Sequence, residues 1–104
     1  MPELLAVSVI TLAELELGVL AATTEDTRAI RLATLVRVRG YPTVPISTDV
    51  AHVFAGLAAR LGAARTRTRV HDLWIAATAV HLAVPVVTQD EDFADLPGVE
   101  VLRV

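Results

Sequence analysis

Apolar residues in this chain form short continuous runs that alternate with longer, helically spaced segments. The runs Leu4–Ile10 and Val84–Thr88 are long enough for strands covered on both faces. A last strand is expected at Val99–Val104. A short strand at Thr43–Ser47 is expected at a sheet edge, because Pro45 has no backbone N–H to donate. Such runs are typical of a parallel sheet buried between helices.

Four helices are expected between these strands. Thr11 is placed to open the first, Thr23 or Thr24 to cap the second, and Ser47 or Thr48 to start the third. Gly40 and Gly62 are the expected stops of the second and third helices. The expected helices are about 11–22, 25–39, 48–61 and 72–82, and residues 63–69 are interpreted as a flexible polar connection.

The spacing of apolar residues also predicts which helix faces are buried. For the second helix the predicted inner residues are Ala29, Leu32, Ala33 and Val36. For the third helix they are Val50, Val53, Phe54, Leu57 and Leu61. Trp74, in the apolar run of the fourth helix, is expected in the core rather than on a surface that stacks a ligand.

The order of strands and helices predicts an α/β domain with a mainly parallel sheet. With 104 residues the chain fits one domain, residues 1–104. Hydrophobic residues make up 54% and mean hydropathy is +0.57, which excludes disorder. No Cys is present, so a disulfide scaffold, a Cys-based zinc site and a cysteine nucleophile are excluded. No membrane segment is expected, since the longest uncharged stretch, residues 73–89, is short and contains Pro85.

Net charge is −3, so nucleic-acid binding would need a local basic patch. Arg65, Arg67 and Arg69 alternate in one polar segment. They are interpreted either as a solvated loop or as contacts to a phosphate backbone or an acidic partner.

Three acidic residues fall where a strand ends or a helix begins, namely Glu14, Asp72 and Asp90, and Asp92 follows two residues later. In an open parallel sheet, ligands bind beyond the carboxyl ends of the strands. Converging carboxylates repel one another unless a cation holds them, and Mg²⁺ or Mn²⁺ prefers such oxygen ligands. The pattern is therefore typical of metal-dependent phosphodiester hydrolysis.

Each acid also has a purely structural interpretation. Thr11 to Glu14 fits a capping box, in which Glu14 bonds the N-terminus of its own helix. Asp72 fits a helix cap, and the segment Asp90–Asp92 fits a solvated turn. Glu16 lies roughly 200° around the helix from Glu14, so at most one of the two faces a shared site.

Three segments resemble PIN-domain ribonuclease toxins of the VapC type. They are Ser8–Leu15 (SVITLAEL), His71–Ala79 (HDLWIAATA) and Val86–Phe93 (VVTQDEDF), in family order and at family spacing. The resemblance covers essentially the whole chain. It implies a PIN-like three-layer fold, with a mainly parallel sheet flanked by helices, and metal-dependent endonucleolytic cleavage of RNA.

The resemblance also implies roles for individual residues. Glu14, Asp72 and Asp90 resemble the family's catalytic acidic ligands of Mg²⁺ or Mn²⁺, with Asp92 as an additional metal ligand. Thr88 resembles the hydroxyl residue that supports them. His71 departs from the Asn more usual before that Asp, and Arg65, Arg67 and Arg69 are candidates for guiding RNA.

One family feature is not matched. Family members begin with a central strand that ends in Asp-Thr or Asp-Ser, whereas this chain starts at the second strand. The neighbours of that missing strand are expected to pair directly or to leave a groove. Two hypotheses follow: a cytoplasmic ribonuclease toxin with a VapB-type antitoxin, and a shortened, inactive PIN fragment that only binds an antitoxin or itself. The family habit suggests a homodimer and no membrane association.

Overall fold

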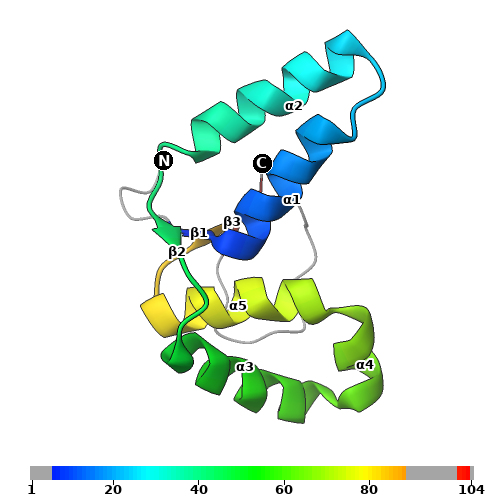
Figure 1. Ribbon diagram of the computed structural model, residues 1–104. Helices are drawn as coiled ribbons and strands as arrows, with labels where there is room; N and C mark the ends of the chain where they lie inside the picture. Colours follow the sequence, from blue (N-terminus) through cyan, green and yellow to red (C-terminus); the bar gives the residue numbers. More distant parts are fainter. Residues whose placement is uncertain (1–5, 89–100, 104) are drawn as a thin grey trace.

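The computed structural model describes residues 6–88 and the short strand 101–103 (Figure 1). The elements, in chain order, are β1 (Val7–Ser8), α1 (Val9–Leu20), α2 (Glu25–Val38), β2 (Thr43–Val44), α3 (Thr48–Leu61), α4 (Ala63–Thr68), α5 (Val70–Leu82), β3 (Val86–Thr88) and β4 (Val101–Arg103). The α/β class expected from the sequence is confirmed.

Every strand pair in the described part of the chain is parallel. Strand β1 pairs with β2, and β3 pairs with β4. The two pairs meet at a single bridge between Ala6 and Val86. There the Ala6 N–H donates to the Pro85 carbonyl at 3.2 Å, and the Val87 N–H donates to the Ala6 carbonyl at 3.0 Å. The strands of the runs Leu4–Ile10 and Val84–Thr88 therefore pair directly, over one residue pair.

Helices cover this small sheet on both sides, so the fold has three layers. Helices α1 and α2 form a hairpin on one side, and α3, α4 and α5 lie on the other (Figure 1). Each side has its own core. Val7, Leu15, Leu35, Val38 and Val87 make the core under the hairpin. The larger core lies between α3, α5 and the strands.

Helix α5 is the most deeply buried element of the described chain. Residues Leu73 and Ile75–Ala79 are all buried, so this stretch is enclosed on every face. Most of these side chains are small, which lets α5 approach both α3 and the strands closely. A helix held in this way gives its N-terminal turn a fixed position.

Helix α3 agrees with its sequence pattern. Ser47 is the N-cap and accepts from the Val50 N–H at 3.2 Å, and Gly62 ends the helix with φ +94°. Val50 and Leu57 are buried, and Val53, Phe54 and Leu61 pack against the same core. The Phe54 ring stacks on Trp74 of α5 with centroids 4.0 Å apart.

Helix α1 begins earlier than its sequence suggests, which corrects two expectations. The first strand ends at Ser8, and Val9 and Ile10 are already helical. Ser8 is the N-cap, because its hydroxyl accepts from the Ile10 N–H at 3.1 Å. Thr11 lies inside the helix, where it is buried and donates its hydroxyl to the Val87 carbonyl at 3.2 Å. The predicted capping box between Thr11 and Glu14 is therefore wrong.

The segment before α5 also differs from its interpretation as a flexible connection. Residues Ala63–Thr68 form the helix α4, which Gly62 separates from α3. Helix α5 then starts at Val70 rather than at Asp72. Ala and Arg are good helix formers. Their helix propensity outweighs the polarity of the segment, which is the property that suggests a loop.

The predicted inner face of α2 is wrong. The helix buries Leu35 and Val38, whereas Leu32 and Val36 are exposed. Arginine contacts set how α2 lies on α1. Arg31 donates to the Gly18 carbonyl at 2.7 Å, and Arg28 donates to the Ala22 carbonyl at 2.9 Å.

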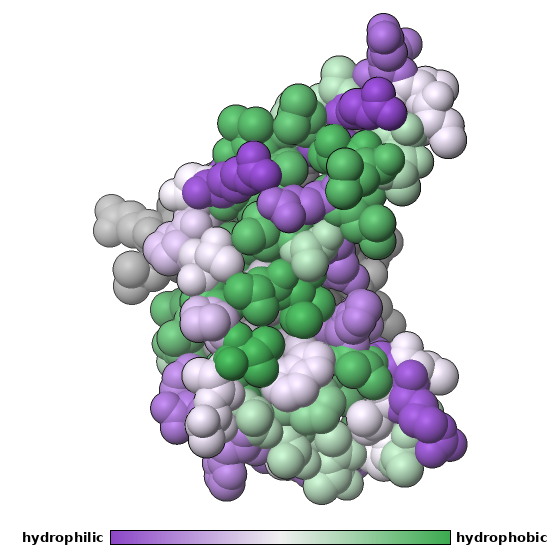
Figure 2. Space-filling view, viewed as in Figure 1, coloured by the Kyte–Doolittle hydropathy of each residue, from purple (hydrophilic) through white to green (hydrophobic). Residues whose placement is uncertain are grey.

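This packing leaves apolar side chains of the α1–α2 hairpin in contact with solvent. They are Leu17, Leu20, Ile30, Leu32 and Val36, which lie on more than one face of the hairpin, and together they will be called the hairpin patch. Figure 2 shows the corresponding apolar colouring over α1 and α2. No helix in the described ranges is long and apolar enough to cross a membrane.

The Phe54–Trp74 pair predicts a specific stability effect. Trp74→Ala should lower the free energy of unfolding by about 3 kcal/mol, because it removes a large side chain that stacks on Phe54 and packs on the core. Urea denaturation measures the change. Leu20→Ala, at a side chain that is 80% exposed, is the matched control and should cost less than about 0.5 kcal/mol. Equal midpoints for Trp74→Ala and the parent would contradict the core assignment.

Candidate active site

Helices α1 and α5 bring two of the sequence-predicted acids to one region. Glu14 lies in the second turn of α1, directly after β1, and Asp72 lies in the first turn of α5. The two helices contact each other, and both contact β1. His71 spans the gap between them, since its Nδ1 is 3.4 Å from Glu14 Oε2.

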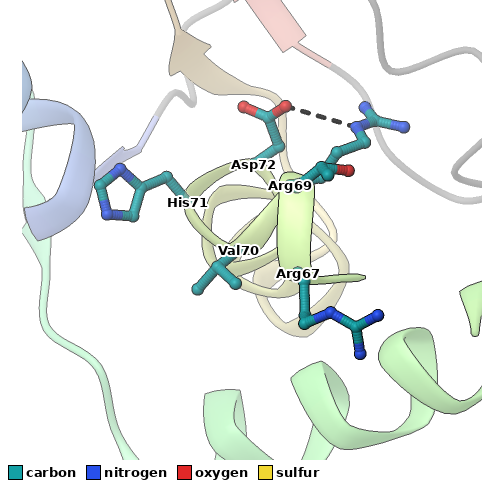
Figure 3. Close-up of a pocket in the computed structure, with 6 residues that line it drawn as sticks. Arg67, Arg69, Val70, His71 and Asp72 are labelled. Atoms are coloured by element: carbon teal, nitrogen blue, oxygen red, sulfur yellow. Dashed lines mark hydrogen bonds and ion pairs between the residues drawn. The ribbon is translucent and has the colours of Figure 1, made fainter. Parts of the chain in front are cut away.

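Asp72 has a cation beside it from its own chain segment. The Arg69 Nε lies 3.4 Å from Asp72 Oδ2, and the two side chains are only 19% and 23% exposed (Figure 3). In the close-up, Asp72 and His71 leave the start of α5 in different directions, with Asp72 facing Arg69. The carboxylate is therefore held at the rim of a pocket lined by residues 67–72.

Neither acid serves as a helix cap. Ser8 caps α1, and Arg69 occupies the N-cap position of α5 with no side-chain capping hydrogen bond. Asp72 still gains from the positive end of the α5 dipole, as an acid in a first turn does. Neither residue therefore occupies the N-cap position of its helix.

Glu16 faces away from this region, as the helical spacing requires. Its Oε1 accepts from Arg39 Nη2 at 2.9 Å, which ties α1 to the end of α2. Glu14 and Glu16 therefore have different roles. Glu14 faces α5, and Glu16 joins the hairpin.

The three arginines are not equivalent. Arg65 and Arg67 lie on α4, and Arg69 joins α4 to α5. Figure 3 shows Arg67 directed away from Asp72, on the other side of the α4–α5 junction, whereas Arg69 is directed toward Asp72. Arg69 is placed to act at the Asp72 carboxylate directly, and the exposed Arg67 offers its charge to solvent.

The remaining site residues follow β3. Thr88 is buried at the end of this strand. Asp90 and Asp92 lie outside the described residues. Within residues 6–88, no three His, Asp or Glu side chains lie close enough together to hold a metal ion. Of the predicted ligands, the described part of the chain contains Glu14 and Asp72.

The donor chemistry of these two acids suits a hard divalent cation. Glu14 is 36% exposed and Asp72 is at a pocket rim, so both carboxylates are accessible to an ion. Carboxylate oxygens are the ligands that Mg²⁺ and Mn²⁺ prefer. The residues present fit such an ion.

Two supporting residues were missed in the sequence. Ser8 caps α1, and Thr11 joins α1 to β3 through its hydroxyl. A Ser directly before a helical segment is a capping signal, but the apolar run through Ile10 concealed it. No sequence signal identifies the Thr11 contact, because Val87 is 76 residues away.

Known proteins are similar to this chain in sequence. The family model of the PIN domain matches residues 2–99. Ribonuclease VapC5 of Mycobacterium tuberculosis is 51% identical over 99% of this chain and 78% of its own length. Ribonuclease VapC4 of the same organism is 42% identical over 94% of this chain and 75% of its own length.

Solved structures agree with these relatives. VapBC-5 of Mycobacterium tuberculosis, described as a member of the VapBC family of toxin–antitoxin systems, superimposes with a TM-score of 0.82 at 50% identity, over 100% of this chain and 85% of that one. FitAcB of Neisseria gonorrhoeae has a TM-score of 0.61 at 26% identity, over 92% and 72% of the two chains. This chain belongs to the PIN-domain family, among its VapC-type toxins.

Proposed function

We propose that this protein is the toxin of a type II toxin–antitoxin system and cleaves RNA as a metal-dependent endoribonuclease. The observation that carries the proposal is the contact between α1 and α5, which brings the turns that carry Glu14 and Asp72 into one region, with neither acid at an N-cap. The relatives are named ribonucleases, which favours the enzyme over an inactive binding fragment. We expect it to act in the cytoplasm, as a homodimer.

PIN ribonucleases generally use a divalent metal. In this chain we propose Mg²⁺ or Mn²⁺, held by Glu14 and Asp72 together with Asp90 and with Asp92 as an additional ligand. Such an ion supplies positive charge where negative charge develops on the phosphodiester. Thr88, buried at the end of β3, would support the acids that follow it.

The residues of the chain would divide the work around that ion. Glu14 and Asp72 would bind the ion. Their remaining oxygen atoms would orient the water that attacks the phosphorus. Arg69 faces the Asp72 carboxylate and lowers the repulsion between neighbouring acids. Arg65 and Arg67 extend the positive charge along α4, where a phosphate backbone can lie.

Removing one acid charge should abolish most of the activity. Asp72→Asn or Glu14→Gln should each lower the Mn²⁺-dependent rate of RNA cleavage at least ~100-fold, because loss of an anionic ligand removes several kcal/mol of transition-state stabilisation. A fluorogenic RNA substrate with and without EDTA measures the rate. Asp49→Asn, at the first turn of α3, is the matched control and should leave the rate unchanged. A wild-type rate in Asp72→Asn would refute the acidic site.

The positive charge of Arg67 on α4 predicts a salt-dependent effect on RNA affinity. Arg67→Ala should weaken binding of RNA to the Asp72→Asn protein about equally for different sequences, and should reduce the slope of log K against log salt by about 0.7, the value for one single-stranded phosphate contact. Fluorescence anisotropy at several salt concentrations gives both quantities. Arg37→Ala, in the last turn of α2, serves as the control. An unchanged slope would remove Arg67 from the RNA surface.

The hairpin patch supports the antitoxin assignment. Leu20 is 80% exposed and Ile30 is 70% exposed, on two helices that enclose a pocket containing Arg31. Apolar surface of this extent is typical of a protein interface. VapBC-5 is described as a member of a family of toxin–antitoxin systems, and we propose that a VapB-type antitoxin covers the hairpin patch of this chain.

A charge placed in the hairpin patch should separate binding from catalysis. Ile30→Asp should weaken co-purification with the cognate antitoxin at least ~10-fold, because it buries an unpaired carboxylate at the interface. RNA cleavage by the free protein should stay unchanged. Ile46→Asp, at an exposed apolar residue outside the hairpin, is the control. Equal antitoxin retention by Ile30→Asp and the parent would place the antitoxin elsewhere.

A further inference from the structure

His71 lies at the one point where α5 reaches the Glu14 carboxylate. Its Nδ1 is 3.4 Å from Glu14 Oε2, and the imidazole is 67% exposed. The ring therefore contributes little to the core. It also caps no helix, because Arg69 is at the N-cap of α5 and Ser8 is at that of α1.

The contact has a direction. The atom pair in contact is His71 Nδ1 and Glu14 Oε2, 3.4 Å apart. Asp72, the next residue, carries its carboxylate to a different side of the same helical turn, beside Arg69 (Figure 3). The first turn of α5 thus places Asp72 in the site and the Nδ1 atom of His71 beside Glu14 of α1.

We propose that His71 is a positioning residue that sets the rotamer of Glu14 for cation binding. With an N–H at Nδ1 it holds Oε2 and leaves Oε1 directed to the ion, as the partners of ligating carboxylates do in metal sites. The neutral Nδ1–H tautomer and the imidazolium both present this N–H. The inference rests on the proposed function, because it assumes that Glu14 is a ligand.

The substitution series separates this role from a purely structural contact. His71→Ala removes the donor. His71→Asn retains one, because the Asn Nδ2 and the His Nδ1 are both bonded to Cγ and occupy nearly the same place. His81→Ala is the matched control, since His81 is an exposed histidine in the last turn of the same helix.

The primary readout is Mn²⁺ affinity of the full chain, measured by isothermal titration calorimetry without RNA. His71→Ala should bind Mn²⁺ about 10-fold more weakly, the low end of the range for residues that support metal ligands, because the contact is exposed. His71→Asn should recover most of the affinity, and His81→Ala should match the parent. The melting temperature without metal should stay within about 2 °C of the parent in all three, since exposed pairs contribute little to stability.

Unchanged Mn²⁺ affinity in His71→Ala would overturn the proposal, and so would a drop in melting temperature with affinity intact. His71→Asn binding as weakly as His71→Ala would also overturn it, because the donor would then be irrelevant. Glu14→Gln separates this inference from the proposed function. If Glu14→Gln binds Mn²⁺ like the parent, the metal site itself is refuted. If Glu14→Gln binds weakly while His71→Ala binds normally, only the role of His71 fails.

Discussion

The complete burial of α5 between α3 and the strands is the constraint on which the rest of the structure depends. Ile75–Ala79 are enclosed on every side, and their small side chains let the helix lie close to both neighbours. Close packing leaves such a helix no freedom to slide or rotate. The position of its first turn, and therefore of His71 and Asp72, follows from this core rather than from the surface residues around the site.

A second link brings the other carboxylate to the same place. Helix α1 starts directly at the end of β1 because Ser8 caps it, and the buried hydroxyl of Thr11 bonds the Val87 carbonyl of β3. A buried hydrogen bond of this kind is costly to break, since the carbonyl would lose its partner away from water. Glu14 lies one turn beyond Thr11 and is carried with it. Two helices from distant parts of the chain are thus anchored on the same strands, which brings the turns that carry Glu14 and Asp72 into one region.

Sequence reasoning succeeded where one signal dominates. Helix α3 has a capping Ser47, a stop at Gly62 and a single apolar stripe, and the structure confirms all three. It failed where signals compete. On α2, apolar residues lie on several faces, and only contact with α1 decides that Leu35 and Val38 are buried. The start of α1 was missed because an apolar run suits a strand and a helix equally well.

The candidate site shows the same division. Glu14 and Asp72 can be predicted from their places at element ends and from the family resemblance, and the structure places neither of them at an N-cap. The approach of His71 to Glu14 depends on the rotation of two helices and on side-chain rotamers. Residue spacing carries no information on either, so this contact had to be read from the structure.

The proposed cation site between α1 and α5 includes Glu14 and Asp72 among its ligands. The most direct test is a crystal structure of the protein soaked in Mn²⁺, with anomalous diffraction recorded to locate the ion. We expect one Mn²⁺ with oxygen atoms of both carboxylates within about 2.0–2.6 Å. A Mn²⁺ site that excludes Glu14, or one carboxylate on the far side of the sheet from the ion, would contradict it.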